Sequence, residues 1–321
     1  MKENVPIVLI HRGYGWYLYY TLNQINSLGS NSSLYLLGDK EVLKAFDKTD
    51  SININKLSGF KSNEFIESYI HMCTNPYDFE LFCFLRWFYL LEFMKSEKIA
   101  KVLYLDSDIL LYTPLEEIFN IYGRDLLNCG FMIPQQEYNS LSWAGSGGTS
   151  YWHYEALEEF CHFLTATYKD REMLPLYQQK WDYHKAKKIG GGVCDMTAFY
   201  FFWRRESKHI TNFSKIVQDH AFDANINLSM NYYKNEFKMC GSFKKINFKN
   251  NKPFGKNIDQ NRDIRFHTLH FQGAAKWSMP MFYTGNQFKR KFQHDISWYI
   301  LKTKKAVKKV KYLTTGKGQV G

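Results

Sequence analysis

Short apolar runs alternate with helical segments through the first hundred residues of the chain. The runs 7–10, 34–37 and 102–105 have the length and continuous hydrophobicity of buried strands. The segments 18–28 and 78–95 between them have helical spacing. Apolar strands that alternate with helices are typical of a parallel sheet with helices on both faces. We therefore predict an α/β fold around a mostly parallel central sheet.

The rest of the sequence gives a looser pattern. We expect further strands at 126–133 and 266–271, helices at 155–168 and 193–203, a strand pair around Gly241, and a glycine–serine loop at 142–148. No internal repeat or linker divides the chain. We therefore expect one domain over residues 1–284 and a separate tail over residues 285–321.

The tail is strongly basic, whereas the body of the chain is nearly neutral. The whole sequence carries 42 Lys and Arg against 31 Asp and Glu, a net charge of +11. The tail holds ten of the basic residues and one acid, Asp295. Lysines mixed with Trp298, Tyr299 and aliphatic residues indicate either a helix on an anionic membrane surface or a solvated tail. Nucleic acid is not expected as a partner, because the body is not basic.

Composition excludes several classes of protein. The chain is 45% hydrophobic and 18% aromatic, which is too apolar for a disordered protein. No apolar run reaches about 18 residues, and the N-terminus lacks the long apolar core of a secretory signal. The six cysteines include no CxxC pair, so neither a zinc site nor a disulfide framework is expected. We expect a cytoplasmic protein, either free in solution or peripheral on the inner face of a membrane.

Two aspartates, Asp106 and Asp108, follow the third predicted strand. In an open parallel sheet, ligands bind beyond the carboxyl ends of the strands, where these side chains are expected. Carboxylates two residues apart can chelate one Mg²⁺ or Mn²⁺, whose remaining ligands are phosphate oxygens and water. The alternative is a strand end that carries two solvated aspartates.

A second motif runs from His270 to Trp277 and contains Gly273 and Lys276. An imidazole nitrogen is a suitable third ligand for Mn²⁺. The glycine permits a close approach of the backbone to a phosphate, and the lysine supplies a mobile positive charge. The alternative is a core histidine beside a surface lysine. Together the two motifs contain the parts of a metal–diphosphate site.

With these motifs the chain resembles the GT-A-fold glycosyltransferases, in particular the family of glycogenin and the lipopolysaccharide galactosyltransferases (family 8). That family has Asp-x-Asp after an aliphatic strand and His-x-x-Gly-x-x-Lys-Pro-Trp near its C-terminal end. The resemblance implies a Rossmann-like fold and Mn²⁺ or Mg²⁺ ligated by Asp106, Asp108 and His270. It also implies that Gly273 and Lys276 bind the donor diphosphate. This chain lacks the proline of the second motif.

The resemblance extends to four further places in the sequence. Arg86 lies on the long helix where the family commonly has an arginine at the nucleotide-sugar; the alternative is an exposed helix arginine. Tyr14, in the loop after the first strand, could stack on uracil. Ser146-Gly147-Gly148 corresponds to a small loop near the sugar, and Asp195 to an acid that touches donor sugar or acceptor. Asp195 and Lys276 are our candidate catalytic residues.

The resemblance implies metal-dependent transfer of a sugar from a nucleoside-diphosphate donor, UDP in that family, to a glycan or lipid-linked acceptor. It implies retention of the anomeric configuration, although Asp195 could act as the base of an inverting route. A haloacid-dehalogenase-type phosphatase is the enzymatic alternative, because it also places Asp-x-Asp after an apolar strand. A non-catalytic carbohydrate-binding protein is the alternative outside enzymes.

Overall fold

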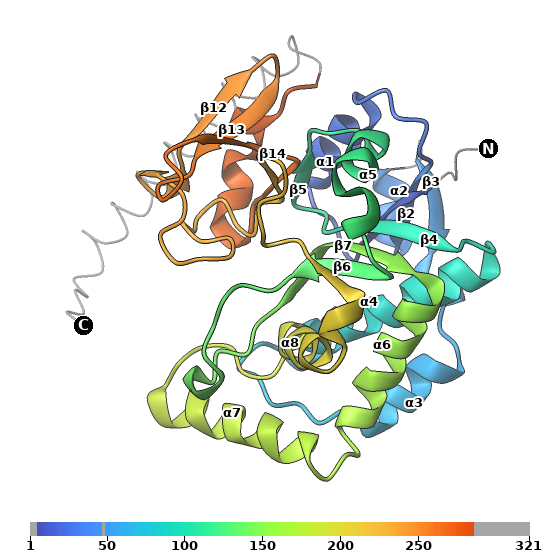
Figure 1. Cartoon of the computed structure of the whole chain (residues 1–321). Helices are drawn as coiled ribbons and strands as arrows, with labels where there is room; N and C mark the ends of the chain where they lie inside the picture. Colours follow the sequence, from blue (N-terminus) through green and yellow to red (C-terminus); the bar gives the residue numbers. More distant parts are fainter. Residues whose placement is uncertain (1–4, 47–48, 286–321) are drawn as a thin grey trace, which may run out of the picture.

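A seven-stranded sheet forms the centre of the computed structural model, which describes residues 5–46 and 49–285 (Figure 1). Its strands are β1 (Ile7–His11), β2 (Leu34–Gly38), β3 (Asp50–Asn53), β4 (Lys101–Leu105), β6 (Cys129–Met132), β7 (Ser146–His153) and β8 (Ile210–Asn212). The spatial order is β3-β2-β1-β4-β7-β6-β8. Only β7 runs antiparallel to its neighbours, β4 and β6. The predicted α/β fold with a mostly parallel sheet is confirmed.

Helices cover both faces of this sheet. One face carries α1 (Leu18–Asn26), α2 (Lys40–Ala45) and α5 (Leu115–Tyr122), and the other carries α3 (Phe60–Ser68), α4 (Tyr77–Ser96), α6 (Tyr154–Thr167) and α8 (Asp195–Glu206). Alternate residues of a strand point to opposite faces, so Val8 packs under α4 while Leu9 packs under α1. Within the described residues, no helix is long and apolar enough to cross a bilayer.

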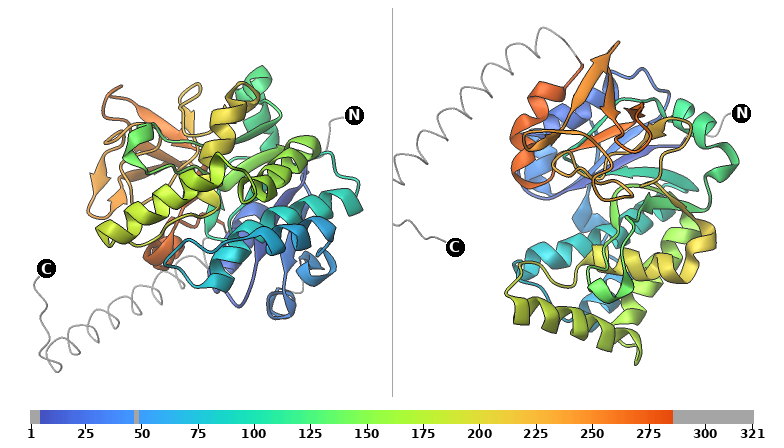
Figure 2. Two further views of the ribbon diagram at one scale, coloured as in Figure 1. Left: turned by 90° about the horizontal axis from the view of Figure 1, so that it is seen from below. Right: turned by 60° about the vertical axis from the view of Figure 1, so that its left-hand side comes forward.

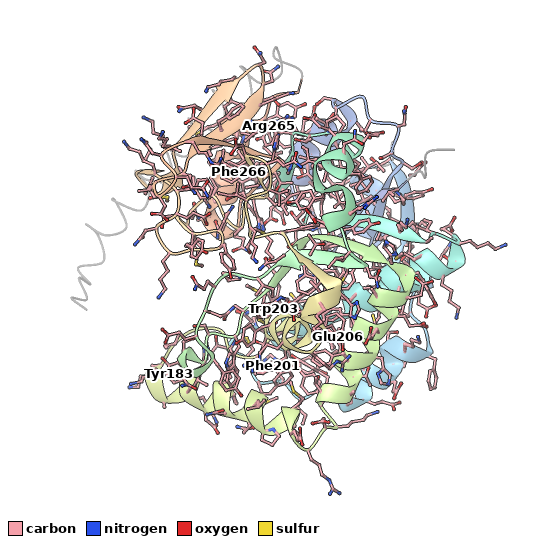
Figure 3. All side chains as sticks on the ribbon, in the orientation of Figure 1. Tyr183, Phe201, Trp203, Glu206, Arg265 and Phe266 are labelled. Carbon is pink, nitrogen blue, oxygen red and sulfur yellow. The ribbon has the colours of Figure 1, made fainter. Side chains whose placement is uncertain are left out.

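The part of the chain after β8 forms a second, smaller sheet beside the central one (Figures 1 and 2). It contains β9 (His220–Ala221), β12 (Ile246–Lys249), β13 (Lys252–Lys256) and β14 (Asp263–Phe266), in the order β12-β13-β14-β9. Phe266, which Figure 3 labels beside Arg265, is fully buried and packs on Phe237. Arg265 pairs with Glu117 of α5. We call residues 220–285 the small lobe.

Most of the expected elements are present, but some differ from the expectation and others are additional. The strand pair around Gly241 is β10 (Met239–Cys240) with β11 (Phe243–Lys244). The expected strand 266–271 is divided between β14 and β15 (Thr268–His270), and α7 (Met173–Lys187) was not anticipated. Ser146, Gly147 and Gly148 do not form a loop, because they begin the central strand β7. The basic tail lies outside the described residues, and the boundary at 284/285 stays a prediction.

A two-stranded pairing joins the small lobe to the central sheet. β5 (Ile109–Leu111) pairs antiparallel with β15, so that His270 lies opposite Ile109. The backbone N–H of Phe271 donates to the carbonyl oxygen of Asp108 at 3.0 Å. Ile109 is fully buried, so the strand that follows the two aspartates is internal. This pairing places the second sequence motif against the first.

Candidate functional site

Asp106, Asp108 and His270 lie together at the end of β4, and we call them the Asp–Asp–His cluster. Their ligand atoms all lie within 4.8 Å of one another. Asp106 directly follows β4, Asp108 precedes β5, and His270 is the last residue of β15. Asp108 and His270 are buried, and Asp106 is partly exposed. The structure therefore brings together the three residues predicted as metal ligands.

The ring of His270 is oriented by its hydrogen bonds. Its Nδ1 lies 3.0 Å from the carbonyl oxygen of Ala224, which can only accept, so Nδ1 carries a proton. Its Nε2 lies 3.3 Å from Oδ1 of Asp108 and faces the cluster. Burial by itself lowers the pKa of His270, but the Asp108 carboxylate outweighs burial and raises this pKa above its ordinary value. A neutral ring in this orientation presents a lone pair where a metal ligand is needed.

Gly148 keeps the space between the donor atoms open. A Cβ at this position would lie 2.8 Å from Oδ2 of Asp106 and 3.2 Å from Cε1 of His270. The backbone N–H of Asp106 donates to the carbonyl oxygen of Gly148 at 2.7 Å, which fixes the two strands at this separation. Two carboxylates and one imidazole form a donor set suited to Mn²⁺ or Mg²⁺. The residues present therefore fit a divalent cation.

Lys276 reaches the same cluster from the short helix after β15. Its Nζ lies 2.6 Å from Oδ2 of Asp108 and 5.2 Å from the centre of the Tyr17 ring. Burial would raise the pKa of Asp108, but His270 and Lys276 hold it well below its ordinary range. Gly273 begins this helix with φ +56°, a conformation that favours glycine.

Arg86 of α4 connects the cluster to a third carboxylate. Its Nη1 lies 2.6 Å from Oδ1 of Asp106, and its Nη2 lies 2.6 Å from Oδ2 of Asp195. Tyr104 also donates to Asp106, and the Trp87 indole donates to Asp195. The side chain of Arg86 is 15% exposed, so the alternative of an exposed helix arginine is wrong. Arg86 thereby holds Asp195 and Asp106 in one site.

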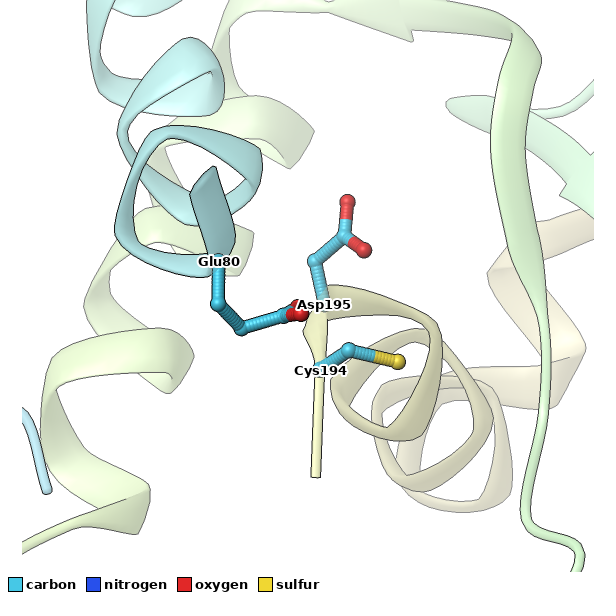
Figure 4. Close-up of side chains that lie close together, drawn as sticks. All are labelled: Glu80, Cys194 and Asp195. Carbon is cyan, nitrogen blue, oxygen red and sulfur yellow. The ribbon is translucent and has the colours of Figure 1, made fainter. Parts of the chain in front are cut away.

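Glu80, which the sequence analysis missed, lies beside Asp195 and Cys194 (Figure 4). Ligand atoms of these three residues are within 4.8 Å of one another. Burial raises the pKa of Glu80, and the nearby Asp195 adds to this effect. Glu80 accepts hydrogen bonds from Asn75 and Cys73. In the sequence, an acid in the first turn of an apolar helix suggests only helix stabilisation, so nothing local marks this position.

His11, the last residue of β1, precedes a loop and contacts the turn between the two aspartates. Ser107 donates to or accepts from Nδ1 of His11 at 2.9 Å. Burial lowers the pKa of His11, although Asp108 acts in the opposite direction. Tyr14 of this loop is 64% exposed, and among the described residues no hydrogen bond or ring contact joins it to the cluster. Its role at a nucleobase stays a prediction.

Solved structures that are similar to this chain include three glycosyltransferases. Mouse xyloside xylosyltransferase 1 is 15% identical, over 65% of this chain and 84% of that one, with a TM-score of 0.46. The galactosyltransferase LgtC, solved with donor and acceptor sugar analogs, is 12% identical, over 92% and 96%, with a TM-score of 0.43. The glycosyltransferase GlyE of Streptococcus pneumoniae is 11% identical, over 66% and 45%, with a TM-score of 0.33.

All three are glycosyltransferases, the class of enzymes whose motifs are similar to the two motifs of this chain. No protein-family model and no curated protein sequence matches the chain. At these identities and TM-scores the likeness does not transfer an activity, so the functional inference depends on the geometry of the site.

Proposed function

We propose that this protein is a metal-dependent glycosyltransferase that uses a nucleoside-diphosphate sugar as donor. The observation that supports the proposal is the Asp–Asp–His cluster with the Lys276 ammonium against it. The cluster lies beyond the carboxyl end of β4, where open α/β sheets bind their ligands. The carboxylate and imidazole groups suit a divalent cation, and the lysine beside them suits a diphosphate. The site therefore suits a cation and a diphosphate that bind together.

The residues of the site have complementary roles in this reaction. A divalent ion bound at the cluster would act as a Lewis acid on the leaving diphosphate. Lys276, which already lies at the cluster, supplies a second positive charge for the departing phosphate oxygens. Arg86 orients Asp106 through a short ion pair and holds Asp195 with its other nitrogen. Asp195 thus has a fixed position from which it can contact the sugar or the acceptor.

The finer parts of the proposal come from the family resemblance. We propose UDP as the nucleotide, Mn²⁺ or Mg²⁺ as the ion, a glycan or lipid-linked acceptor, and retention of configuration. Asp195 is buried and already accepts two hydrogen bonds, which suits an electrostatic role better than that of a free base. Proton NMR of the anomeric signal in the first product distinguishes retention from inversion.

The phosphatase alternative fits the site less well. A carboxylate that acts as a nucleophile must be free to attack, yet Oδ1 of Asp106 is held by Arg86 and Tyr104. That alternative also gives no role to His270 and Lys276. A phosphatase would release phosphate from a simple ester such as p-nitrophenyl phosphate, whereas the proposed transferase would not.

Thermal unfolding with UDP, GDP and CMP, each with and without Mn²⁺, tests the proposal. A nucleotide at a hundred times its dissociation constant stabilises the folded state by about 2.7 kcal/mol. We expect stabilisation by one nucleotide only when Mn²⁺ is present, and its loss in Asp108→Ala. Asp263→Ala, which removes an exposed carboxylate of the small lobe, is the matched control. No stabilisation by any nucleotide, or normal transfer by Asp108→Ala, would contradict the proposal.

Contact with a membrane through the basic tail is a separate part of the proposal. The tail carries ten basic residues against one acid. Each lysine near an anionic surface contributes roughly 1 kcal/mol, and salt screens this attraction. We expect the full chain to sediment with vesicles of anionic phospholipid at low salt and to be released at high salt. If the chain does not sediment with the vesicles at low salt, the proposed membrane contact is wrong and the alternative of a solvated tail is favoured.

A further inference from the structure

A fully buried ion pair lies directly behind His270. Nζ of Lys244, on β11, lies 2.7 Å from Oδ1 of Asp223, and both side chains have an exposed fraction of 0%. The second oxygen of Asp223 accepts the backbone N–H of His270 at 3.0 Å. The carboxylate is therefore shared between an ammonium group and the backbone of a residue in the Asp–Asp–His cluster.

The segment 223–226 binds three of the four polar groups of His270. Besides the contact of Asp223 with the backbone N–H, the carbonyl oxygen of Ala224 accepts from the ring Nδ1 at 3.0 Å. The backbone N–H of Ile226 donates to the carbonyl oxygen of His270 at 2.9 Å. Only Nε2 is left, and it faces Asp108. The segment therefore sets both the tautomer of the ring and the direction in which Nε2 points.

Lys244 in turn fixes the position of the segment 223–226. Its Nζ donates to the carbonyl oxygens of Asn225 at 2.7 Å and Met230 at 3.3 Å, in addition to its contact with Asp223. Its backbone N–H donates to the carbonyl oxygen of Ile226 at 2.7 Å. One ammonium group thus connects three points of the loop that surrounds His270.

A buried ion pair is a poor way to gain stability. The cost of removing two charges from water offsets most of their attraction, and apolar residues of similar volume often serve as well. What the pair does provide is a set of directed hydrogen bonds at fixed positions. Groups that orient a histidine ligand strongly affect how well it binds a metal.

We propose that Asp223 and Lys244 are positioning residues for a divalent cation at the Asp–Asp–His cluster. They hold the segment 223–226 so that the ring of His270 has its proton on Nδ1 and presents Nε2 to the cation. This inference rests on the metal site of the proposed function and goes beyond it, because it places two determinants of metal affinity outside the residues that touch the metal.

Binding of Mn²⁺ alone, without nucleotide, measures the effect directly. We expect Lys244→Met to weaken Mn²⁺ binding about 10- to 100-fold in calorimetric or EPR titrations. The double variant Asp223→Asn with Lys244→Met removes both charges and avoids an unpaired buried carboxylate. We expect it to unfold at a urea concentration close to that of the wild type and still to bind Mn²⁺ at least tenfold more weakly.

Lys249→Met is the matched control. Lys249 pairs with Asp263 at 2.9 Å in the same lobe, but both side chains are exposed. We expect its Mn²⁺ affinity to equal that of the wild type. Wild-type affinity in a folded Lys244 variant, or an equal loss in Lys249→Met, would overturn the proposal.

A measurement on the wild-type protein does not depend on whether these variants fold. With Zn²⁺ as a diamagnetic substitute, ¹⁵N NMR of labelled histidine rings reports which nitrogen of His270 binds the ion. We expect a proton on Nδ1 and coordination through Nε2; the opposite assignment would overturn the proposal. If the wild type binds no divalent ion, the proposed function fails together with this inference. If the wild type binds Mn²⁺ and Asp108→Ala does not, but the Lys244 variants bind normally, only this inference fails.

Discussion

At the scale of single residues, Gly148 gives the sharpest test of the site, because a methyl group there enters the space between the donor atoms. The added Cβ would lie 2.8 Å from Oδ2 of Asp106, closer than real Cβ contacts. The φ of Gly148 lies outside the left-handed region, so alanine does not strain the backbone. We expect Gly148→Ala to fold and to lose most of its Mn²⁺ affinity and transfer activity.

Gly190→Ala is the control for this substitution. The nearest atom to a Cβ at Gly190 is Oγ1 of Thr74 at 3.9 Å, and the φ of Gly190 is also outside the left-handed region. We expect normal metal binding and activity. Wild-type Mn²⁺ affinity in Gly148→Ala would show that the cation, if bound, does not lie between Asp106 and His270.

Arg86 allows a second prediction at this scale, because one planar group binds two carboxylates. Its two nitrogens each lie 2.6 Å from an oxygen, one of Asp106 and one of Asp195. A lysine is a point charge and cannot make both contacts with this geometry. Loss of one charged hydrogen bond costs about 1.5–3 kcal/mol, so we expect Arg86→Lys to lower kcat/KM about 10- to 100-fold.

The exposed Arg205 offers a matched control. It also contacts two carboxylates, those of Glu159 and Glu206, but far from the cluster in the fold, at the end of α8. Exposed ion pairs contribute little, so Arg205→Lys should keep wild-type kcat/KM. Equal kcat/KM in Arg86→Lys and the wild type would remove Arg86 from the site.

A residue of the site can be predicted from the sequence only where the residues next to it indicate its role. Asp106 and Asp108 are recognisable because they follow an apolar strand directly. Glu80 and Asp223 are not, since each owes its importance to partners far along the chain. For Gly148 the sequence predicts a loop, whereas the structure places this residue in strand β7.

At the scale of elements, the junction between β14 and β15 carries a buried histidine that makes stability depend on pH. His267 has an exposed fraction of 0% and stacks on His220, and its Nδ1 lies 3.1 Å from Oγ1 of Thr113. Burial, with His220 and Arg265 nearby, holds the pKa of His267 well below its ordinary value of 6.5. Arg265 itself pairs with Glu117 of α5.

The sign of the effect follows from proton uptake. Below about pH 6.5 the unfolded chain protonates this histidine and the folded chain does not, so stability falls as the pH decreases. The contribution approaches about 1.4 kcal/mol per pH unit. In urea unfolding at pH 7.5 and 5.5, we expect His267→Gln to lose less stability than the wild type. His162→Gln, at an exposed position of α6, should behave like the wild type. Equal losses in all three would contradict the prediction.

The elements that the sequence predicts well are those with long apolar signals. β1, β2 and β4 are continuous apolar runs because both faces of each strand are covered by helices. In contrast, β12 alternates between half-buried and exposed residues, and β9 has only two residues. β9 forms only against β14, which is distant in sequence, and β12, although it pairs with the adjacent β13, has no continuous apolar run. The pattern of the chain therefore does not reveal these strands.

At the scale of the whole molecule, the two halves of the site belong to different parts of the fold. Asp106 and Asp108 extend from the central sheet, whereas His270 belongs to the small lobe. The pairing of β5 with β15 connects their backbones at the site. The sequence identified both motifs, but their meeting depends on this pairing, which no local pattern specifies. A cation that binds all three side chains therefore ties the small lobe to the central sheet.

Hydrogen exchange measured with and without Mn²⁺ tests this link between the two parts. A ligand that binds only the folded site suppresses the local openings that separate its ligands. We expect Mn²⁺ to slow exchange in 104–111 and also in 220–226 and 263–271, although these segments are far apart in the sequence. Asp108→Ala should abolish all three effects, and Asp263→Ala should preserve them. Protection confined to 104–111 would mean that the cation binds the two aspartates alone, and that His270 and the small lobe serve the donor by another route.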